Sequence, residues 1–284
     1  MIAIDYMITS NCNLNCPFCY GSQGVIEMTS EQKLQLIKEV SLLDNIFLII
    51  SGGEPLSSPD IVNVCSYAKQ NGIKIAIQTN GTYLNVLKQI LPYVDWIGLP
   101  IDGISSDVCK KTRTIKNHFD KVRESIKIIE SYKKDNNTNT PLIKIGTVLT
   151  KYNAGQINDI FSFLTKHQIE VWKIYKIRQR GKMAIENSYK SICLREDEIL
   201  NISNKINGLQ SNLKIYFSND NANDSYVIIE PNSEIIVING KNQYSCGTLI
   251  TDSKISISTL KQALQKVDLE KICDNINKSF PQWR

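Results

Sequence analysis

The sequence lacks the long uncharged apolar runs that cross a membrane, and it carries little excess charge. No stretch of about 18 such residues occurs, and the first residues do not combine a basic start with a long apolar segment. We therefore expect neither a transmembrane helix nor a secretory signal, and a cytoplasmic location follows by default. The net charge of +5 over 284 residues is mild. Because nucleic-acid-binding domains carry a denser basic face, no nucleic-acid polymer is expected as a partner.

Histidine is scarce, which narrows the kinds of metal site that the chain can form. His118 and His167 are the only two histidines, whereas cysteine occurs eight times, and Cys12, Cys16 and Cys19 lie close together. Closely spaced cysteines in a reducing compartment bind metal more often than they form disulfides. Three thiolates on one loop can hold three irons of a 4Fe–4S cluster, whereas a structural zinc loop would need a fourth cysteine or histidine nearby. We therefore predict one 4Fe–4S cluster with an open iron.

Apolar stretches alternate with helical patterns over the first two thirds of the chain. The unbroken apolar run 46–50 is typical of a strand buried on both faces. Strands are expected at 2–8, 46–50, 73–78, 94–99, 142–149 and 171–177, with helices at 31–43, 61–70, 83–90, 119–132 and 157–167. This alternation favours parallel strands joined by right-handed crossovers, and six units are too few for the usual eight-fold barrel. We predict an α/β fold, a partial (β/α)6 barrel of parallel strands.

The chain changes character at about residue 190. A helix over 196–206, a hairpin from strands 226–229 and 234–238, and a last amphipathic helix over 260–273 are expected there. We predict a barrel domain over residues 1–190 and a small C-terminal α+β cap over 191–284 that covers the substrate side.

A second motif follows the apolar strand 46–50. Gly52, Gly53, Glu54 and Pro55 stand at the end of this strand, and ligands of α/β folds bind at the carboxyl ends of strands. Two glycines let a ligand approach the backbone, and the glutamate can meet an ammonium group. Gly-Gly before proline is also a common turn, so the motif gains its meaning from the cysteine loop one strand earlier.

The C-x3-C-x2-C spacing of the cysteines and the motif Gly52–Pro55 together resemble the radical S-adenosylmethionine (radical SAM) superfamily. The resemblance covers residues 2 to 178. It implies S-adenosylmethionine as a second cofactor, chelated to the open iron through its amine and carboxylate. It also implies a 5′-deoxyadenosyl radical that abstracts a hydrogen atom from the substrate, and a flavodoxin- or ferredoxin-type electron donor.

The same resemblance extends to weaker positions that would contact S-adenosylmethionine. Thr79 and Asn80 resemble the family's Thr/Ser-Asn-Gly element, although an ordinary strand-end turn explains them as well. Arg113 resembles an arginine that pairs with the cofactor carboxylate, or it lies on a solvated loop. The remaining candidates, beside the adenine or on the adenine-facing strand, are Tyr20, Val148 and Thr150. A plain core strand explains Val148 equally well.

Positive side chains on and beyond strands five and six bear on the substrate. Lys144, Lys173 and Arg178 would favour a phosphorylated or carboxylated substrate if they point inward, although strand-edge lysines can also extend to solvent. The segments 116–118, 142–145, 171–175 and 224–229 resemble viperin-type enzymes, which dehydrate nucleoside triphosphates. That resemblance implies phosphate contacts for the two lysines and a place near the chemistry for Tyr226.

Two alternatives remain open. The segment 229–237 followed by Cys246 resembles the C-terminal module of peptide-modifying radical enzymes, in which Cys246 would donate a hydrogen atom to a peptide radical. A lone cysteine is also commonly a small buried apolar residue. The other alternative is a non-catalytic iron–sulfur carrier or sensor, for which an open iron beside an amine-binding motif has little use.

Overall fold

The computed structural model describes residues 2–19, 21, 24–177, 188–209, 211–218, 225–240, 242–251, 254–268 and 270–272. The strands are β1 (Ile2–Thr9), β2 (Ile46–Gly52), β3 (Lys74–Gln78), β4 (Trp96–Pro100), β5 (Leu142–Leu149), β6 (Val171–Lys176), β7 (Lys214–Ser218), β8 (Ser225–Ile229), β9 (Glu234–Asn239), β10 (Asn242–Thr248), β11 (Ile250–Thr251) and β12 (Lys254–Ile255). The helices are α1 (Ser30–Val40), α2 (Ile61–Gln70), α3 (Leu84–Ile90), α4 (Ser106–Arg113), α5 (His118–Asp135), α6 (Ile157–Leu164), α8 (Glu196–Asn207) and α9 (Ser258–Gln265). None of these helices combines the length and apolar character needed to cross a membrane.

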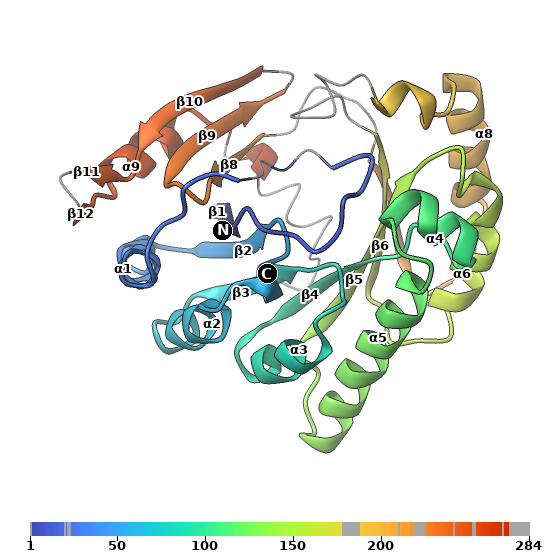
Figure 1. Cartoon of the computed structure of the whole chain (residues 1–284), viewed down its shortest axis with the longest axis horizontal. Helices are drawn as coiled ribbons and strands as arrows, with labels where there is room; N and C mark the ends of the chain where they lie inside the picture. The colour runs from blue at the N-terminus through green and yellow to red at the C-terminus, as the bar shows by residue number, and fades with distance from the viewer. Residues whose placement is uncertain are drawn as a thin grey trace.

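One curved ten-stranded sheet organises the molecule. Its order is β10-β9-β8-β1-β2-β3-β4-β5-β6-β7. Within this order, all neighbouring strands from β8 through β1 to β7 are parallel. Helices α1, α2, α3, α5 and α6 lie along its outer face (Figure 1). The prediction of an α/β fold built on a partial barrel of parallel strands is confirmed, and all six expected strands are present.

The core lies between the outer face of the sheet and these helices. Phe47, Leu48 and Ile50 of β2 are at most 1% exposed, as expected for a strand with two buried faces. Helix α1 buries Leu36, Ile37 and Val40 against them. It begins at a capping box, in which the Thr29 side chain accepts from the Gln32 N–H and the Gln32 side chain accepts from the Thr29 N–H.

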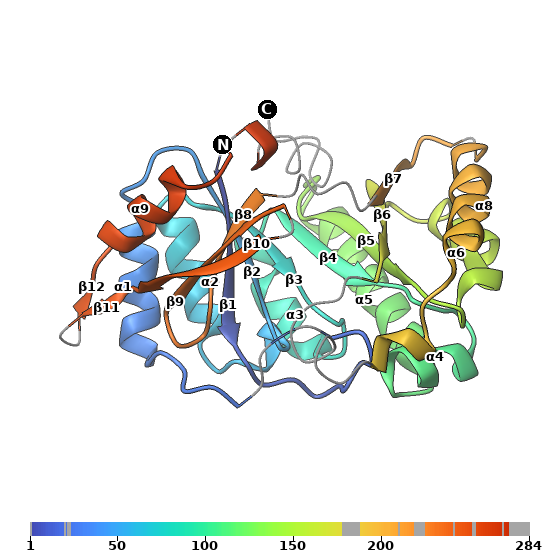
Figure 2. The same ribbon diagram turned by 90° about the horizontal axis from the view of Figure 1, so that it is seen from above.

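The C-terminal third extends both edges of the sheet. Strand β8 pairs with β1, and the expected hairpin is confirmed as β8 and β9. Strand β7, which the sequence analysis did not predict, pairs with β6 at the opposite edge. Figure 2 shows β10 and α9 at one end of the sheet and β7 and α8 at the other, and Figure 1 shows α9 and α8 at the same two ends. The last helix, α9, is shorter than the expected 260–273 and ends at Gln265.

Candidate active site

The cysteine loop runs from the end of β1 to the start of α1, across the carboxyl ends of the parallel strands. Cys12 and Cys16 are partly buried and Cys19 is exposed. The far end of the loop returns to its origin, because Glu27 Oε1 accepts hydrogen bonds from Thr9 Oγ1 and Ser10 N, each at 2.8 Å. The loop is therefore closed at its base.

The thiols of this loop affect one another. Burial raises the pKa of Cys12 and of Cys16, and neighbouring negative charges, including the other thiols of the loop, raise both further. Opposing this, the Leu14 N–H donates to Cys12 Sγ at 3.4 Å, and the Arg113 cation lowers the pKa of Cys16. An open hollow of about 430 Å³ adjoins the loop, lined by Ser10, Asn11, Cys12, Asn13, Leu14, Asn15, Gly24 and Thr114.

This donor set fits an iron–sulfur cluster better than a single metal ion. Within the described segments, no three His, Cys, Asp or Glu side chains converge on one ion position. A cluster does not require such convergence, because each of the three thiolates binds a different iron. Cys12, Cys16 and Cys19 would hold the cluster.

Gly52 and Gly53 let the end of β2 press against the cysteine loop. The Gly53 N–H donates to Thr9 O and the Glu54 N–H to Asn11 O, both at 2.8 Å. A Cβ on Gly53 would lie 2.2 Å from Asn11 O, and one on Gly52, whose φ is +138°, would lie 2.3 Å from Thr9 O. The backbone that approaches these glycines closely is thus the end of β1 and the start of the cysteine loop, whereas the prediction was the approach of a ligand.

Glu54 joins the ends of β2 and β3. Its fully buried carboxylate accepts from Leu56 N at 2.9 Å, from Thr79 Oγ1 at 2.6 Å and from Asn80 N at 2.6 Å. Burial raises the pKa of Glu54 to about 7, against the lowering effect of these donors. Pro55 follows in a short 3-10 turn. Thr79 and Asn80 are therefore more than a strand-end turn, since both bind the motif glutamate.

Asn80 also contacts the cysteine loop. Its Nδ2 donates to Asn13 Oδ1 at 2.8 Å and lies 3.9 Å from Cys12 Sγ. The Asn80 carbonyl lies 3.0 Å from Nε2 of His118, and burial lowers the pKa of His118 to about 3. The neutral ring can therefore donate to this carbonyl. The structure thus brings together the cysteine loop, Glu54 and Asn80.

Arg113 does not lie on a solvated loop. It ends α4, a helix that the sequence analysis did not predict, and its side chain is 15% exposed. Its Nε donates to the fully buried Asp102, and its Nη1 lies 3.7 Å from Cys16 Sγ. Asp102 is a residue that sequence reasoning missed. The sequence feature that could have revealed it is an acidic residue directly after an apolar strand.

The inner face of the sheet carries a charged group of side chains. Lys144 of β5 is 5% exposed. The Nζ atoms of Lys144 and Lys173 lie 6.0 and 5.3 Å, respectively, from the centroid of the Tyr175 ring. Asp5 of β1 accepts a short hydrogen bond from Ser51 and interacts electrostatically with Lys144. The lysines therefore point inward, but Asp5 offsets part of their charge. Asp5 is the second acid that the sequence analysis missed, since it lies inside an otherwise apolar strand.

The other residues predicted to bind the cofactor or the substrate, or to take part in catalysis, lie at separate places in the fold. The Val148 N–H donates to Asp102 Oδ1 at 2.6 Å, and Thr150 is fully buried, its hydroxyl accepting from Tyr152 N at 3.3 Å. Tyr226 packs with Met7 and its neighbours, whereas Cys246 packs against the main core beside Lys266. The structure therefore does not bring Tyr226 and Cys246 together. Tyr20 and Arg178 lie outside the described residues.

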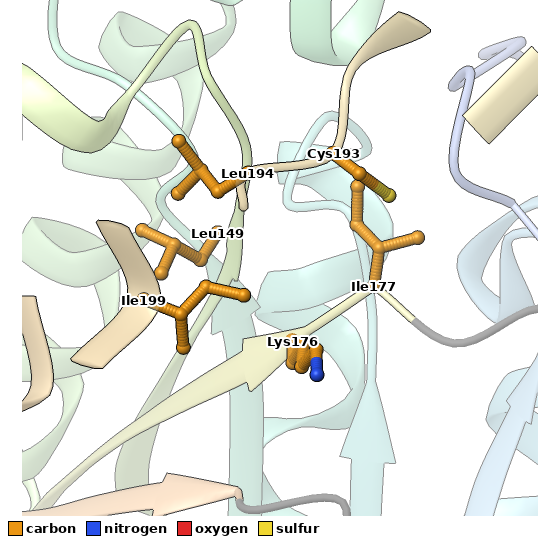
Figure 3. Close-up of a pocket in the computed structure, with 6 residues that line it drawn as sticks. All are labelled: Leu149, Lys176, Ile177, Cys193, Leu194 and Ile199. Carbon is orange, nitrogen blue, oxygen red and sulfur yellow. The ribbon is translucent and has the colours of Figure 1, made fainter. Parts of the chain in front are cut away.

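A small cavity lies beyond the ends of β5 and β6. Its volume is about 20 Å³, and it is lined by Leu149, Lys176, Ile177, Cys193, Leu194 and Ile199 (Figure 3). This space suits about one water molecule. It is too small for a substrate.

Comparison with known proteins agrees with this geometry. Among curated relatives, an S-adenosylmethionine-dependent nucleotide dehydratase of Flammeovirga pacifica is 26% identical over 81% of this chain and 80% of its own length. An AdoMet-dependent heme synthase of Methanosarcina barkeri is 29% identical over 63% of the chain, which spans about half (51%) of that protein.

Solved structures share the fold. SuiB of Streptococcus suis bound to S-adenosylmethionine superposes with a TM-score of 0.65 at 17% identity, over 86% of this chain and 62% of SuiB. The protein anSMEcpe with bound AdoMet and a Cp18Cys peptide superposes with a TM-score of 0.64 at 16% identity. The superposition covers 98% of this chain and 87% of anSMEcpe.

The sequence model described as the Radical SAM superfamily matches residues 6–164, which include the cysteine loop, Glu54, Asn80 and Arg113. A 4Fe–4S cluster and S-adenosylmethionine are the cofactors of that family. The chain belongs to the radical SAM superfamily.

Proposed function

We propose that this chain is an enzyme that cleaves S-adenosylmethionine reductively and directs the resulting radical at a nucleotide, in a viperin-like dehydration of a nucleoside triphosphate. When bound, the cluster and S-adenosylmethionine supply a 5′-deoxyadenosyl radical that removes a hydrogen atom from the substrate. The protein's contribution is to bind, orient and shield the reactants.

The residues divide that work by position. Cys12, Cys16 and Cys19 bind the cluster at the carboxyl end of the sheet. The backbone of Gly52 and Gly53 fixes the loop. The buried Glu54 binds Thr79 and Asn80 and so shapes the polar edge at which the amine of S-adenosylmethionine would bind. Thr79 orients the Glu54 carboxylate, to which it donates at 2.6 Å. Arg113 offers a guanidinium to the cofactor carboxylate.

The inward placement of Lys144 and Lys173 is the observation that supports a phosphorylated substrate. Both lie on the inner face of adjacent strands, with Lys144 opposite Gly98 and Gly146 opposite Lys173 in the register. Ammonium groups held in a partly enclosed, weakly hydrated space attract phosphate. The nucleotide dehydratase relatives, of which this chain covers 80% and 86%, support the same substrate class.

The first experiment tests the radical chemistry. Anaerobically reconstituted protein, dithionite and S-adenosylmethionine should yield 5′-deoxyadenosine and methionine. Cys12→Ala, Cys16→Ala and Cys19→Ala should each lose the cluster and this activity. A chain that holds its cluster but releases no 5′-deoxyadenosine would instead be an iron–sulfur carrier or sensor.

The second experiment tests the substrate. Addition of CTP, UTP or GTP should accelerate release of 5′-deoxyadenosine, and Lys173→Ala should raise the nucleotide concentration needed for half-maximal stimulation about tenfold or more. Cleavage without nucleotide should change little. The matched control is Lys74→Ala, a strand lysine with a 57% exposed side chain that pairs with Asp95. Equal effects of Lys173→Ala on stimulated and unstimulated cleavage would remove the phosphate role.

Radical modification of a peptide is the second candidate. It is favoured by a relative named mycofactocin maturase, 26% identical over 64% of this chain, and by the fold shared with peptide-bound anSMEcpe. Under this reading nucleotides leave 5′-deoxyadenosine release unchanged, and Cys246→Ala alters the product of a peptide substrate.

A further inference from the structure

The guanidinium of Arg113 is held between a thiol of the cysteine loop and a buried carboxylate. Its Nη1 donates to Cys16 Sγ at 3.7 Å, and its Nε donates to Asp102 Oδ2 at 2.5 Å. Its Cζ lies 5.1 Å from the centroid of the Phe18 ring. Contacts with the cysteine loop and with Asp102 thus fix the plane and the direction of the group.

Asp102 is itself held on both sides. It is fully buried, and its second oxygen, Oδ1, accepts from Val148 N at 2.6 Å. Its backbone carbonyl accepts from Asn153 Nδ2 at 3.0 Å. Because the carboxylate is fixed in this way, it can hold the arginine in one orientation toward Cys16.

We propose that Arg113 raises the reduction potential of the 4Fe–4S cluster by donating to the Cys16 thiolate, and that Asp102 is the residue that positions it. The inference rests on the proposed function, since the cluster must be held by the three loop cysteines. One electron, supplied by an external reductant such as dithionite, adds one negative charge to the cluster. Arg113 stays protonated and transfers nothing.

The physical basis is the charge difference between the two oxidation states. A cation and an N–H donor beside a ligand sulfur stabilise the more negative, reduced state, and hydrogen bonds to the sulfurs are known determinants of cluster potential. The burial of Asp102 and the 15% exposure of Arg113 limit screening by water.

This role is compatible with a contact between Arg113 and the cofactor carboxylate. Among the residues that the structure describes, Nη2 has no hydrogen-bond partner, whereas Nε and Nη1 are engaged. One guanidinium can therefore donate to the thiolate and to a carboxylate at once.

The test is an anaerobic redox titration followed by the EPR signal of the reduced cluster, without S-adenosylmethionine or substrate. In Arg113→Gln the ratio of reduced to oxidised cluster at a fixed potential should fall about tenfold, as expected for loss of a hydrogen bond to a charged group. For one electron this is a midpoint about 59 mV lower. The midpoint potential of Arg113→Lys should lie between those of the wild type and Arg113→Gln. The control is Arg123→Gln, an arginine with a 47% exposed side chain on α5, which should titrate like the wild type.

Asp102→Asn separates positioning from simple charge. Removal of a nearby negative charge would by itself raise the potential, whereas loss of positioning lowers it. We expect a lower potential, and no further lowering when Asp102→Asn is added to Arg113→Gln. A raised potential in Asp102→Asn would overturn the positioning role.

An unchanged midpoint in Arg113→Gln with wild-type iron content would overturn the inference. If that variant loses its cluster, Arg113→Lys decides, and its unchanged midpoint has the same meaning. Failure of the cluster assignment looks different, because the wild type itself would then show no reducible 4Fe–4S signal. Failure of the radical chemistry would leave the titration unchanged and abolish release of 5′-deoxyadenosine.

Discussion

Asp5 and Lys144 form an oppositely charged pair of groups inside the barrel. Burial raises the pKa of Asp5 to about 6, with the Ser51 hydrogen bond and Lys144 acting against it and Glu230 adding to it. Burial also lowers the pKa of Lys144 to about 8, partly offset by Asp5. Both groups are therefore less stable as ions than they would be in water, as expected for charges that leave solvent.

The raised pKa of Asp5 predicts a pH-dependent stability. Between pH 3.8 and about 6, the folded chain holds a proton on Asp5 that the unfolded chain has released. The free energy of unfolding therefore falls as pH rises through this window. In Asp5→Asn this contribution should be lost, which urea unfolding of the apo-protein at about pH 4.5 and about pH 6.5 would measure.

Asp120→Asn is the matched control for that measurement. Asp120 lies on α5 with a 61% exposed side chain, paired with Arg123. This variant should keep the wild-type difference between the two pH values. If Asp5→Asn also keeps it, Asp5 does not carry the raised pKa.

The residues that could be predicted from sequence are those whose local pattern is complete. The cysteine spacing and the motif around Glu54 lie within short stretches next to strand ends. The local sequence alone is therefore enough to place these residues at the carboxyl ends of the strands. Asp5 and Asp102 depend on partners far along the chain, namely Ser51 and Arg113. A single acid beside apolar residues does not reveal which distant group it will meet.

At the scale of elements, the end of β2 works as a clamp on the cysteine loop. Gly53 has an ordinary backbone conformation, yet a Cβ there would lie 2.2 Å from Asn11 O. The requirement for glycine is therefore one of space, because the two backbones are joined by hydrogen bonds at 2.8 Å.

Gly53→Ala should push the loop away from β2. We expect the free energy of unfolding to fall by about 3 kcal/mol, as for overpacking of a tight interior, together with a loss of bound iron. Urea unfolding and iron analysis measure the two effects. Gly155→Ala is the control, because a Cβ there meets nothing within 4 Å, and its change should stay within about 0.5 kcal/mol. Equal effects of both substitutions would contradict the clamp.

Among the elements that escaped prediction, β7 and α4 did so for a shared reason. Strand β7 is short and no residue in it is fully buried, and α4 has only Cys109 and Thr112 buried. Each element is short and buries few side chains, so the apolar signal that it leaves in the sequence is small. They form because a neighbour is already in place, β6 for the strand and the Asp102–Arg113 pair for the helix.

At the scale of the whole molecule, the C-terminal segment completes the first strand. Val227, Ile229, Ile235 and Val237 are fully buried in the same core as β1 and β2. At about 1.5–3 kcal/mol each, they contribute roughly 6–12 kcal/mol, comparable to the entire stability of about 5–15 kcal/mol of a typical domain.

A chain cut after residue 190 should therefore not fold stably. It would expose the edge of β1 that β8 covers and lose these four buried side chains. We expect no cooperative urea transition and weak near-ultraviolet circular dichroism. A soluble monomer of residues 1–190 with a sharp transition would instead establish the barrel as an independent domain, as the sequence boundary predicts.

The pairing of Ile4 with Val227 joins positions that lie more than 220 residues apart in the sequence. Contacts of such long range form late, and β1 gains β8 as its second neighbour only after residue 227 has been synthesised. During synthesis the cysteine loop is thus emerging beside a strand with one free edge.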